Sequence, residues 1–213
     1  MNKNAPPELA GAPRKMLVPS SVLAICIGLL CIAVALLPAH IQAYFVLSDA
    51  GISKWQLWRL ITAHFTHTNL WHLGLNLVGL ALIWLLFIEQ LSWRYTLFTV
   101  AICTAGLSVL LIITNGLSDI LWYAGLSGTL HGLFAFAVAL ELKHKRLSTF
   151  VLIGLGCFKL SYEQLGGSTQ DTADLIGANV AIDAHLWGAV LGVFCAVIVL
   201  TINLVKHKTQ KRR

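Results

Sequence analysis

The chain has 213 residues, of which 57% are hydrophobic and 11% are charged, and its mean hydropathy is +0.78. About a quarter of a soluble domain is normally charged, so this composition excludes an ordinary soluble protein and indicates an integral membrane protein. The formal net charge of +6 could suggest nucleic-acid binding, but the Lys and Arg residues are segregated along the chain in a way that marks membrane topology instead.

Six apolar runs predict six transmembrane helices and therefore an all-α membrane protein. The runs cover about residues 18–37, 70–88, 95–113, 126–140, 147–160 and 178–205. We expect one membrane domain over residues 18–205, with a basic tail at 1–17 before it and another at 206–213 after it. An even number of spans places both tails on the same side of the membrane.

The distribution of positive charge predicts the orientation. If both tails are cytoplasmic, all but three of the fifteen Lys and Arg residues lie on the cytoplasmic side, as the positive-inside rule requires. The three exceptions are Lys54, Arg59 and Lys159. The loop at residues 161–177 contains three acidic residues and no Lys or Arg, as expected of an external loop.

The first apolar run has a second interpretation. Basic residues precede it and Pro38, Ala39 and Ala43 follow it, which is also the pattern of a secretory signal peptide. Its apolar core is longer than the usual core of about 7–15 residues, which favours a retained helix. The five cysteines lie inside apolar runs without a CxxC spacing, so we interpret them as small buried side chains and assign them no chemistry.

Three histidines, His64, His67 and His72, lie close together before and at the start of the second run. Imidazoles are common zinc ligands, so a metal site is one interpretation. Their spacing does not place all three on one helix face, and no Cys or acidic residue joins them. We therefore expect no metal and no cofactor, and we interpret His67 as a structural or loop-anchoring residue.

His72 and Asn76 are candidates for function because polar side chains inside a span are costly. They lie one helical turn apart, about 25 Å and 20 Å from the cytoplasmic end of the second run at Glu89. Lys159 and Glu163, four residues apart, predict a local ion pair at the outer end of the fifth helix.

The fourth run begins with Gly125-Leu126-Ser127-Gly128. From Ser127 to Lys143 a helix would rise about 24 Å, against a hydrocarbon core of about 30 Å, so Ser127 is predicted below the outer surface. Polar and glycine residues in 114–126 predict irregular backbone dipping inward, which requires a protein-lined or wet cavity. A serine next to glycines can also serve helix packing alone.

His185 lies about 24–32 Å from the cytoplasmic end of the sixth run and therefore shares the depth of Ser127. Small residues at four-residue spacing accompany both, and they allow two membrane helices to approach closely. They are Gly128 and Gly132 in the fourth run, and Ala184, Gly188, Gly192 and Ala196 in the sixth. We predict Ser127 as a nucleophile and His185 as its general base, although a structural histidine is the alternative.

An acyl-transfer site also needs donors for an oxyanion. Ser127 stands at a helix start, where free N–H groups and the positive end of the dipole favour negative charge. His72 and Asn76 could add donors from the second helix, so we predict the oxyanion hole from Ser127, His72 and Asn76.

In these motifs the chain resembles the rhomboid intramembrane serine proteases. The resemblance covers about residues 18–205 and is carried by Trp58-Arg59, His67 with His72 and Asn76, Gly125-Leu126-Ser127-Gly128, and Ala184-His185 with Gly188 and Gly192. It implies a six-helix bundle, a Ser127–His185 dyad and an oxyanion hole from His72 and Asn76. It also implies a re-entrant first external loop anchored by Trp58 and Arg59, a pair that could otherwise be an interfacial anchor.

One position departs from ordinary rhomboids, which commonly carry an aromatic residue four positions after the nucleophile. Here that residue is His131, and its neighbourhood resembles the rhombosortase branch. That resemblance implies an enzyme of the bacterial inner membrane, opening to the periplasm, with His131 tuning His185. Its substrates would be exported proteins that end in Gly-Gly, an apolar helix and a basic tail, and the product could be transferred to an amine.

Three alternatives remain at this stage. A generic rhomboid protease would cleave single-span membrane proteins, and a non-catalytic rhomboid-like protein would bind clients without the dyad. A transporter or metal-handling protein would use the intramembrane histidines as ligands or proton carriers.

Overall fold

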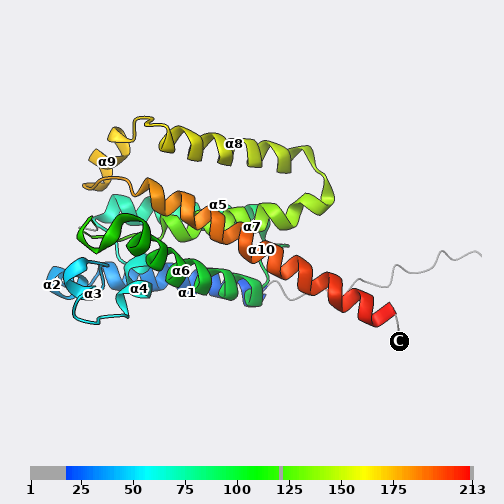
Figure 1. The fold of residues 1–213 in the computed structure, drawn as a ribbon, viewed down its shortest axis with the longest axis horizontal. Helices are drawn as coiled ribbons and strands as arrows, with labels where there is room; N and C mark the ends of the chain where they lie inside the picture. Colours follow the sequence, from blue (N-terminus) through cyan, green and yellow to red (C-terminus); the bar gives the residue numbers. More distant parts are fainter. Residues whose placement is uncertain (1–17, 120–121, 212–213) are drawn as a thin grey trace, which may run out of the picture.

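The computed structural model describes residues 18–119 and 122–211, and these residues form helices and loops without a β-strand (Figure 1). Six long helices correspond to the six apolar runs: α1 (Val18–Ala35), α5 (Leu70–Phe87), α6 (Trp93–Asp119), α7 (Ser127–Glu141), α8 (Leu147–Gln164) and α10 (Ile182–Lys211). The connections contain α2 (Ala39–Gln42), α3 (Asp49–Ile52), α4 (Arg59–Thr62) and α9 (Gln170–Ile176), with 3₁₀ turns at Ala63–Phe65 and Leu142–His144. The prediction of an all-α protein is confirmed.

Three of the described helices are long and apolar enough to cross a membrane. They are α5 over Leu70–Phe87, α6 over Trp93–Thr114 and α10 over Ile182–Gln210. Together with the hydrophobic composition, they identify a membrane protein.

The prediction of irregular backbone over residues 114–126 is wrong for its first part. Helix α6 continues to Asp119, and Trp122 to Leu126 form the non-helical part of the described segment. Hydropathy marks where a helix loses its apolar character, whereas an α-helix satisfies its own backbone hydrogen bonds and can continue among polar residues. Residues 120–121 lie outside the described part of the chain. For the same reason α10 extends past residue 205 to Lys211.

Helix α7 is central in the bundle and packs against α5, α6 and α10 (Figure 1). Ten of its fifteen residues are buried, although the helix is too short to span a bilayer without tilting or thinning it. Leu133 and Phe136 are almost completely enclosed, and Leu130 joins them in the main apolar core.

The α7–α10 seam, formed by Gly128, Gly132, Gly188 and Gly192, brings two backbones into contact. A Cβ atom added to Gly188 would overlap the carbonyl oxygen of Gly128, and one added to Gly192 would overlap that of Gly132. In the opposite direction, a Cβ on Gly132 would lie 2.9 Å from the carbonyl oxygen of Gly188. The glycines therefore let the helices that carry Ser127 and His185 approach at backbone distance.

Arg59 and Trp58 tie α4 to the preceding segment. The Arg59 guanidinium is buried and donates through Nη1 to the carbonyl oxygens of Ala43 at 2.7 Å and Val46 at 2.5 Å. The half-exposed Trp58 donates from its indole Nε1 to the Tyr44 carbonyl at 3.0 Å. These bonds satisfy carbonyls outside the helices and hold the loop that lies over the start of α7.

Helix α8 lies at one edge of the molecule, between α7 and the terminal α9–α10 segment in chain order (Figure 1). Of its eighteen residues, Thr149 and Glu163 are buried. Near its first turn, Arg146 donates to Glu141 of α7 at 2.9 Å. Near its last turn, Glu163 turns toward α10.

Candidate active site

The segment before α7 is held by backbone pairing with the loop that precedes α4. The Tyr123 N–H donates to the Leu47 carbonyl at 2.8 Å, and the Leu47 N–H donates back at 3.0 Å. Two residues later, the Gly125 N–H donates to the Ala63 carbonyl at 3.0 Å. The buried Tyr123 hydroxyl donates to the Gly125 carbonyl at 2.9 Å. These bonds fix the path by which the chain enters the helix at Ser127.

Gly125 has a conformation and a contact that both require glycine. Its φ of +126° is unfavourable for a residue with a side chain. A Cβ there would also lie 2.7 Å from His72 Cε1 and Nε2, so the bare backbone makes room for the imidazole edge. Gly125 thus seats the His72 ring beside the loop that leads to Ser127.

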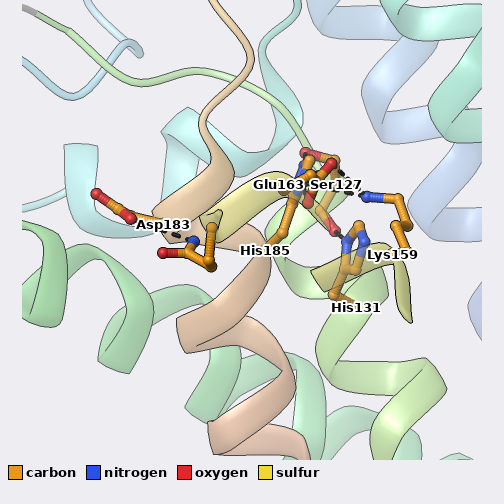
Figure 2. Close-up of polar contacts among 7 residues, drawn as sticks. Ser127, His131, Lys159, Glu163, Asp183 and His185 are labelled. Atoms are coloured by element: carbon orange, nitrogen blue, oxygen red, sulfur yellow. Dashed lines mark hydrogen bonds and ion pairs between the residues drawn. The ribbon is translucent and has the colours of Figure 1, made fainter. Parts of the chain in front are cut away.

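Ser127 and His185 form the predicted pair. Ser127 is the first residue of α7 and His185 lies in the first turn of α10. Their side chains approach to 3.0 Å between Ser127 Oγ and His185 Nε2 (Figure 2). Ala184, fully buried beneath them, packs against Gly128 at the start of the seam.

The other ring nitrogen of His185 faces a carboxylate that the sequence interpretation did not assign to the site. Glu163 places Oε2 at 3.0 Å and Oε1 at 3.2 Å from His185 Nδ1. Lys159 donates to Glu163 Oε1 at 2.6 Å, so the predicted ion pair is present, and its Nζ lies 3.5 Å from His185 Nδ1. Figure 2 shows the three side chains converging from α8 and α10. The four-residue spacing of Lys159 and Glu163 predicted their ion pair, but it did not indicate that His185 on another helix would join them.

His131 lies flat against His185. The two rings stack with centroids 4.1 Å apart and planes inclined by 18°. His131 Nδ1 is 2.8 Å from the carbonyl oxygen of Ser127, an acceptor, so Nδ1 carries the proton of that bond. The position that departs from ordinary rhomboids therefore touches both the backbone of Ser127 and the imidazole of His185 (Figure 2).

His72 and Asn76 lie on the opposite wall, on α5. Asn69 caps that helix by accepting from the His72 N–H at 2.8 Å. His72 Nδ1 is 3.0 Å from the Thr68 hydroxyl, which leaves Nε2 toward Gly125. The Asn76 amide donates one hydrogen to the His72 carbonyl at 3.0 Å, and it has a second hydrogen to offer.

A cavity of about 1180 Å³ opens between α5, α7, α8 and α10. Its lining includes the polar side chains of the site together with apolar residues of all four helices. The polar lining residues named above are His72, Asn76, Ser127, His131, Lys159, Glu163 and His185. An apolar cavity with a few convergent polar groups is typical of a ligand or substrate site.

The three histidines weighed as metal ligands point to different partners. His64 is fully buried, with Nε2 3.0 Å from Ser108 Oγ and Nδ1 3.0 Å from Thr129 Oγ1, and burial lowers its pKa to about 3. His67 packs edge-on against His72 with centroids 5.1 Å apart. Over residues 18–119 and 122–211, no three His, Cys, Asp or Glu residues are grouped as metal ligands.

The model of the Rhomboid domain family matches residues 54–202, which include all the residues that surround Ser127. The match covers more than half of the chain, so the protein belongs to the rhomboid family, a family of intramembrane proteases. No curated protein matches the chain.

Proposed function

We propose that this protein is an intramembrane serine endopeptidase in which Ser127 is the nucleophile and His185 the general base. The observation that carries the proposal is the 3.0 Å contact between Ser127 Oγ and His185 Nε2 at the wall of a large cavity. A hydroxyl becomes an effective nucleophile when an adjacent imidazole can accept its proton.

In the first step, Ser127 Oγ attacks the carbonyl carbon of the scissile peptide and its proton passes to His185 Nε2. The tetrahedral intermediate collapses to an acyl ester on Ser127, and His185 returns the proton to the leaving amine. Water then attacks the ester with His185 accepting its proton, and His185 returns that proton to Ser127 Oγ as the ester bond breaks. The released acid ionises to a carboxylate, and the free serine is restored.

The negative oxygen of the intermediate needs donors. The first ladder bond of α7 runs from the Leu130 N–H to the Leu126 carbonyl, so the N–H of Ser127 precedes the ladder and is available for an oxyanion. His72 Nε2 and the second amide hydrogen of Asn76 are proposed as the side-chain donors.

We further propose six spans, formed by α1, α5, α6, α7, α8 and α10, with a re-entrant loop that contains Trp58 and Arg59. The basic tails, residues 1–17 and 206–213, would lie in the cytoplasm on either side of the domain at 18–205. The site would then open to the periplasmic side of a bacterial inner membrane.

The finer proposal is rhombosortase activity on proteins that end in Gly-Gly, an apolar helix and a basic tail. A basic C-terminus would stay in the cytoplasm and place the Gly-Gly segment near the outer end of the helix, at the depth of Ser127. Glycines weaken a helix and present bare backbone. They suit a nucleophile whose surroundings include the rings of His131 and His185, which both contact Ser127.

His131 supports this branch because its imidazole stacks on His185 and bonds the Ser127 carbonyl. An acyl ester on Ser127 can be attacked by water or by an amine, whose nitrogen would form an amide as the serine oxygen leaves. We propose that His131, adjacent to both residues, influences which acceptor is used.

The test is co-expression of the full chain with two reporters, one carrying a Gly-Gly sorting tail and the other a generic single-span segment. The released products are analysed by mass spectrometry, with Ser127→Ala as the inactive control and a Val-Val tail as the matched substrate control. Cleavage at Gly-Gly by the wild type alone is expected.

Cleavage of the generic reporter only would refute the rhombosortase assignment and leave the protease standing. Cleavage that persists in purified Ser127→Ala protein would refute the protease mechanism. A free carboxylate on the released product would indicate hydrolysis, whereas an added amine mass would indicate transfer.

A further inference from the structure

We propose that Glu163 is a positioning residue that completes a Ser127–His185–Glu163 catalytic triad, with Lys159 as its counter-ion. The inference rests on the proposed protease function and extends it, because the family resemblance implies a dyad. It assigns to α8, which otherwise contributes apolar cavity wall, a direct part in controlling the general base.

The geometry is that of an orienting carboxylate. Both oxygens of Glu163 lie within hydrogen-bond distance of His185 Nδ1, at 3.0 Å and 3.2 Å, while Nε2 of the same ring faces Ser127 Oγ at 3.0 Å. Glu163 and His185 are each only 6% exposed. A buried carboxylate beside a buried imidazole interacts more strongly than the same pair in water.

This arrangement determines which ring nitrogen carries the proton. An ionised carboxylate only accepts hydrogen bonds, so His185 Nδ1 must donate, and Nε2 is left with a lone pair toward Ser127. When Nε2 takes the serine proton, the Nδ1 proton stays on the ring. Glu163 then stabilises the positive imidazolium without itself becoming protonated, as the acid of a serine protease triad does.

Lys159 holds the Glu163 carboxylate in place, and its own positive charge disfavours the protonated form of His185. Its Nζ donates to Glu163 Oε1 at 2.6 Å and lies 3.5 Å from His185 Nδ1, and its side chain is about half exposed to solvent. Two further imidazoles face His185, His131 stacked on it from α7 and His72 from α5. Among these contacts, Glu163 is therefore the negatively charged group. The groups around it are the imidazoles and the Lys159 ammonium.

A purely structural role for Glu163 must be separated from this one, because Glu163 is one of two buried residues on α8 and could simply hold that helix against α10. The chain offers a matched control in the next residue. Gln164 donates from Nε2 to Asp183 of α10 at 3.4 Å, so Gln164→Ala removes a side-chain contact between the same helices and leaves the hydrogen bonds of His185 in place.

The test uses the purified full-length protein in detergent and in lipid vesicles. The variants are Glu163→Gln, Glu163→Asp, Lys159→Met and Gln164→Ala, with Ser127→Ala as the blank. A fluorophosphonate probe reports the reactivity of Ser127 without a protein substrate, and cleavage of the Gly-Gly reporter supplies kcat and KM. Thermal melts confirm that each variant is folded.

We expect Glu163→Gln to lower the labelling rate and kcat by about 100–10 000-fold with little change in KM, because a neutral amide no longer enforces the tautomer or stabilises the imidazolium. Glu163→Asp should recover part of the rate. Gln164→Ala should label like the wild type.

The pH profile provides a second readout. Loss of the carboxylate should move the acid limb of the kcat/KM profile to lower pH by about one unit, since the protonated ring loses a stabilising charge. Lys159→Met should move the limb the other way. A residue that only holds α8 in place would produce neither shift. If Glu163→Gln does not fold, Glu163→Asp supplies the labelling rate and the pH profile in its place.

Wild-type labelling in Glu163→Gln, or equal effects of Glu163→Gln and Gln164→Ala, would overturn the triad and leave the serine protease intact. Shifts in the same direction for Glu163→Gln and Lys159→Met would overturn it as well. Labelling that is absent from the wild type, or unchanged in Ser127→Ala, would instead refute the protease function and the triad with it.

Discussion

Two of the helices that line the cavity, α7 and α8, are attached to the bundle in different ways. Ten of the fifteen residues of α7 are buried, and its backbone touches that of α10 along the glycine seam. Two of the eighteen residues of α8 are buried, and side chains near its ends, Arg146 and Glu163, join it to its neighbours. Backbone contact leaves little freedom, whereas side-chain contacts can be changed one at a time.

This difference separates two tasks. The seam fixes the distance between Ser127 and His185, which a nucleophile and its base need to within a few tenths of an ångström. In the proposed mechanism, helix α8 supplies charge to His185, which is already in position as the general base. Substitutions on the seam should therefore separate Ser127 from His185, and substitutions on α8 should change the charge around His185 without moving it.

The largest effect is expected for the reacting pair itself. Ser127→Ala and His185→Ala should each reduce kcat by about a million-fold, and the double variant should lose no more, because the two residues act as one unit. We expect neither substitution to prevent folding, so expression and membrane insertion should stay close to wild type. Rates from purified proteins and a double-mutant comparison measure this, and additive losses would contradict it.

The next largest loss is expected from opening the seam. Gly188→Val should lower kcat by at least about 100-fold, since its side chain would overlap the Gly128 carbonyl and displace His185 from Ser127. Gly132→Val should behave alike, because its side chain would meet the Gly188 carbonyl. Activity in detergent and in membranes, together with thermal melts, provides the measurement.

Gly154→Val is the matched control on α8. A Cβ at Gly154 meets no atom within 4 Å, and the residue is exposed on the outer face of that helix. Its activity and melting temperature should equal those of the wild type. If Gly188→Val retained full activity, the seam would not control the distance between the reacting groups.

The contrast between α7 and α8 also explains what the sequence could predict. Ser127, His185 and the seam glycines carry local signals, since small residues at four-residue spacing and polar residues inside apolar runs can be counted along one helix. Glu163 carried no such signal for its contact with His185. Its partner lies 22 residues away on another helix, and the rotation of α8 about its axis depends on packing that spacing does not encode.

The ends of the helices also show which features the sequence of one helix predicts and which it does not. The apolar runs predicted all six long helices, but α6 continues to Asp119 and α10 to Lys211, beyond the apolar residues. Gly125 belongs to a motif that the sequence shows, but the sequence does not show why a glycine is needed there. The need comes from the close approach of the His72 ring, which depends on the position of α5 beside the loop. Contacts between elements supply what the pattern within one element lacks.

An intermediate effect is expected on the wall opposite the seam. His72→Ala or Asn76→Ala should lower kcat by about 10–1000-fold with little change in KM, because each removes one of the proposed donors to the oxyanion in the transition state. Steady-state kinetics with the Gly-Gly reporter measure kcat and KM separately for each variant. A change in KM alone for both variants would assign these residues to substrate binding.

The smallest effect is expected at the Arg146 end of α8, the end opposite Glu163. Arg146→Ala removes an ion pair with Glu141, but the Arg146 side chain is 58% exposed, and such surface pairs contribute only about 0.2–1 kcal/mol. The buried Glu141 keeps a second partner, since Gln90 donates to its other oxygen. We expect the melting temperature to fall by less than about 4 °C and kcat to stay unchanged. A large loss of activity would mean that the position of the whole helix, and not the charge of Glu163 at its far end, governs the base. Equal kinetics in Arg146→Ala and the wild type, beside a slow Glu163→Gln, would place the influence of α8 at its outer end alone.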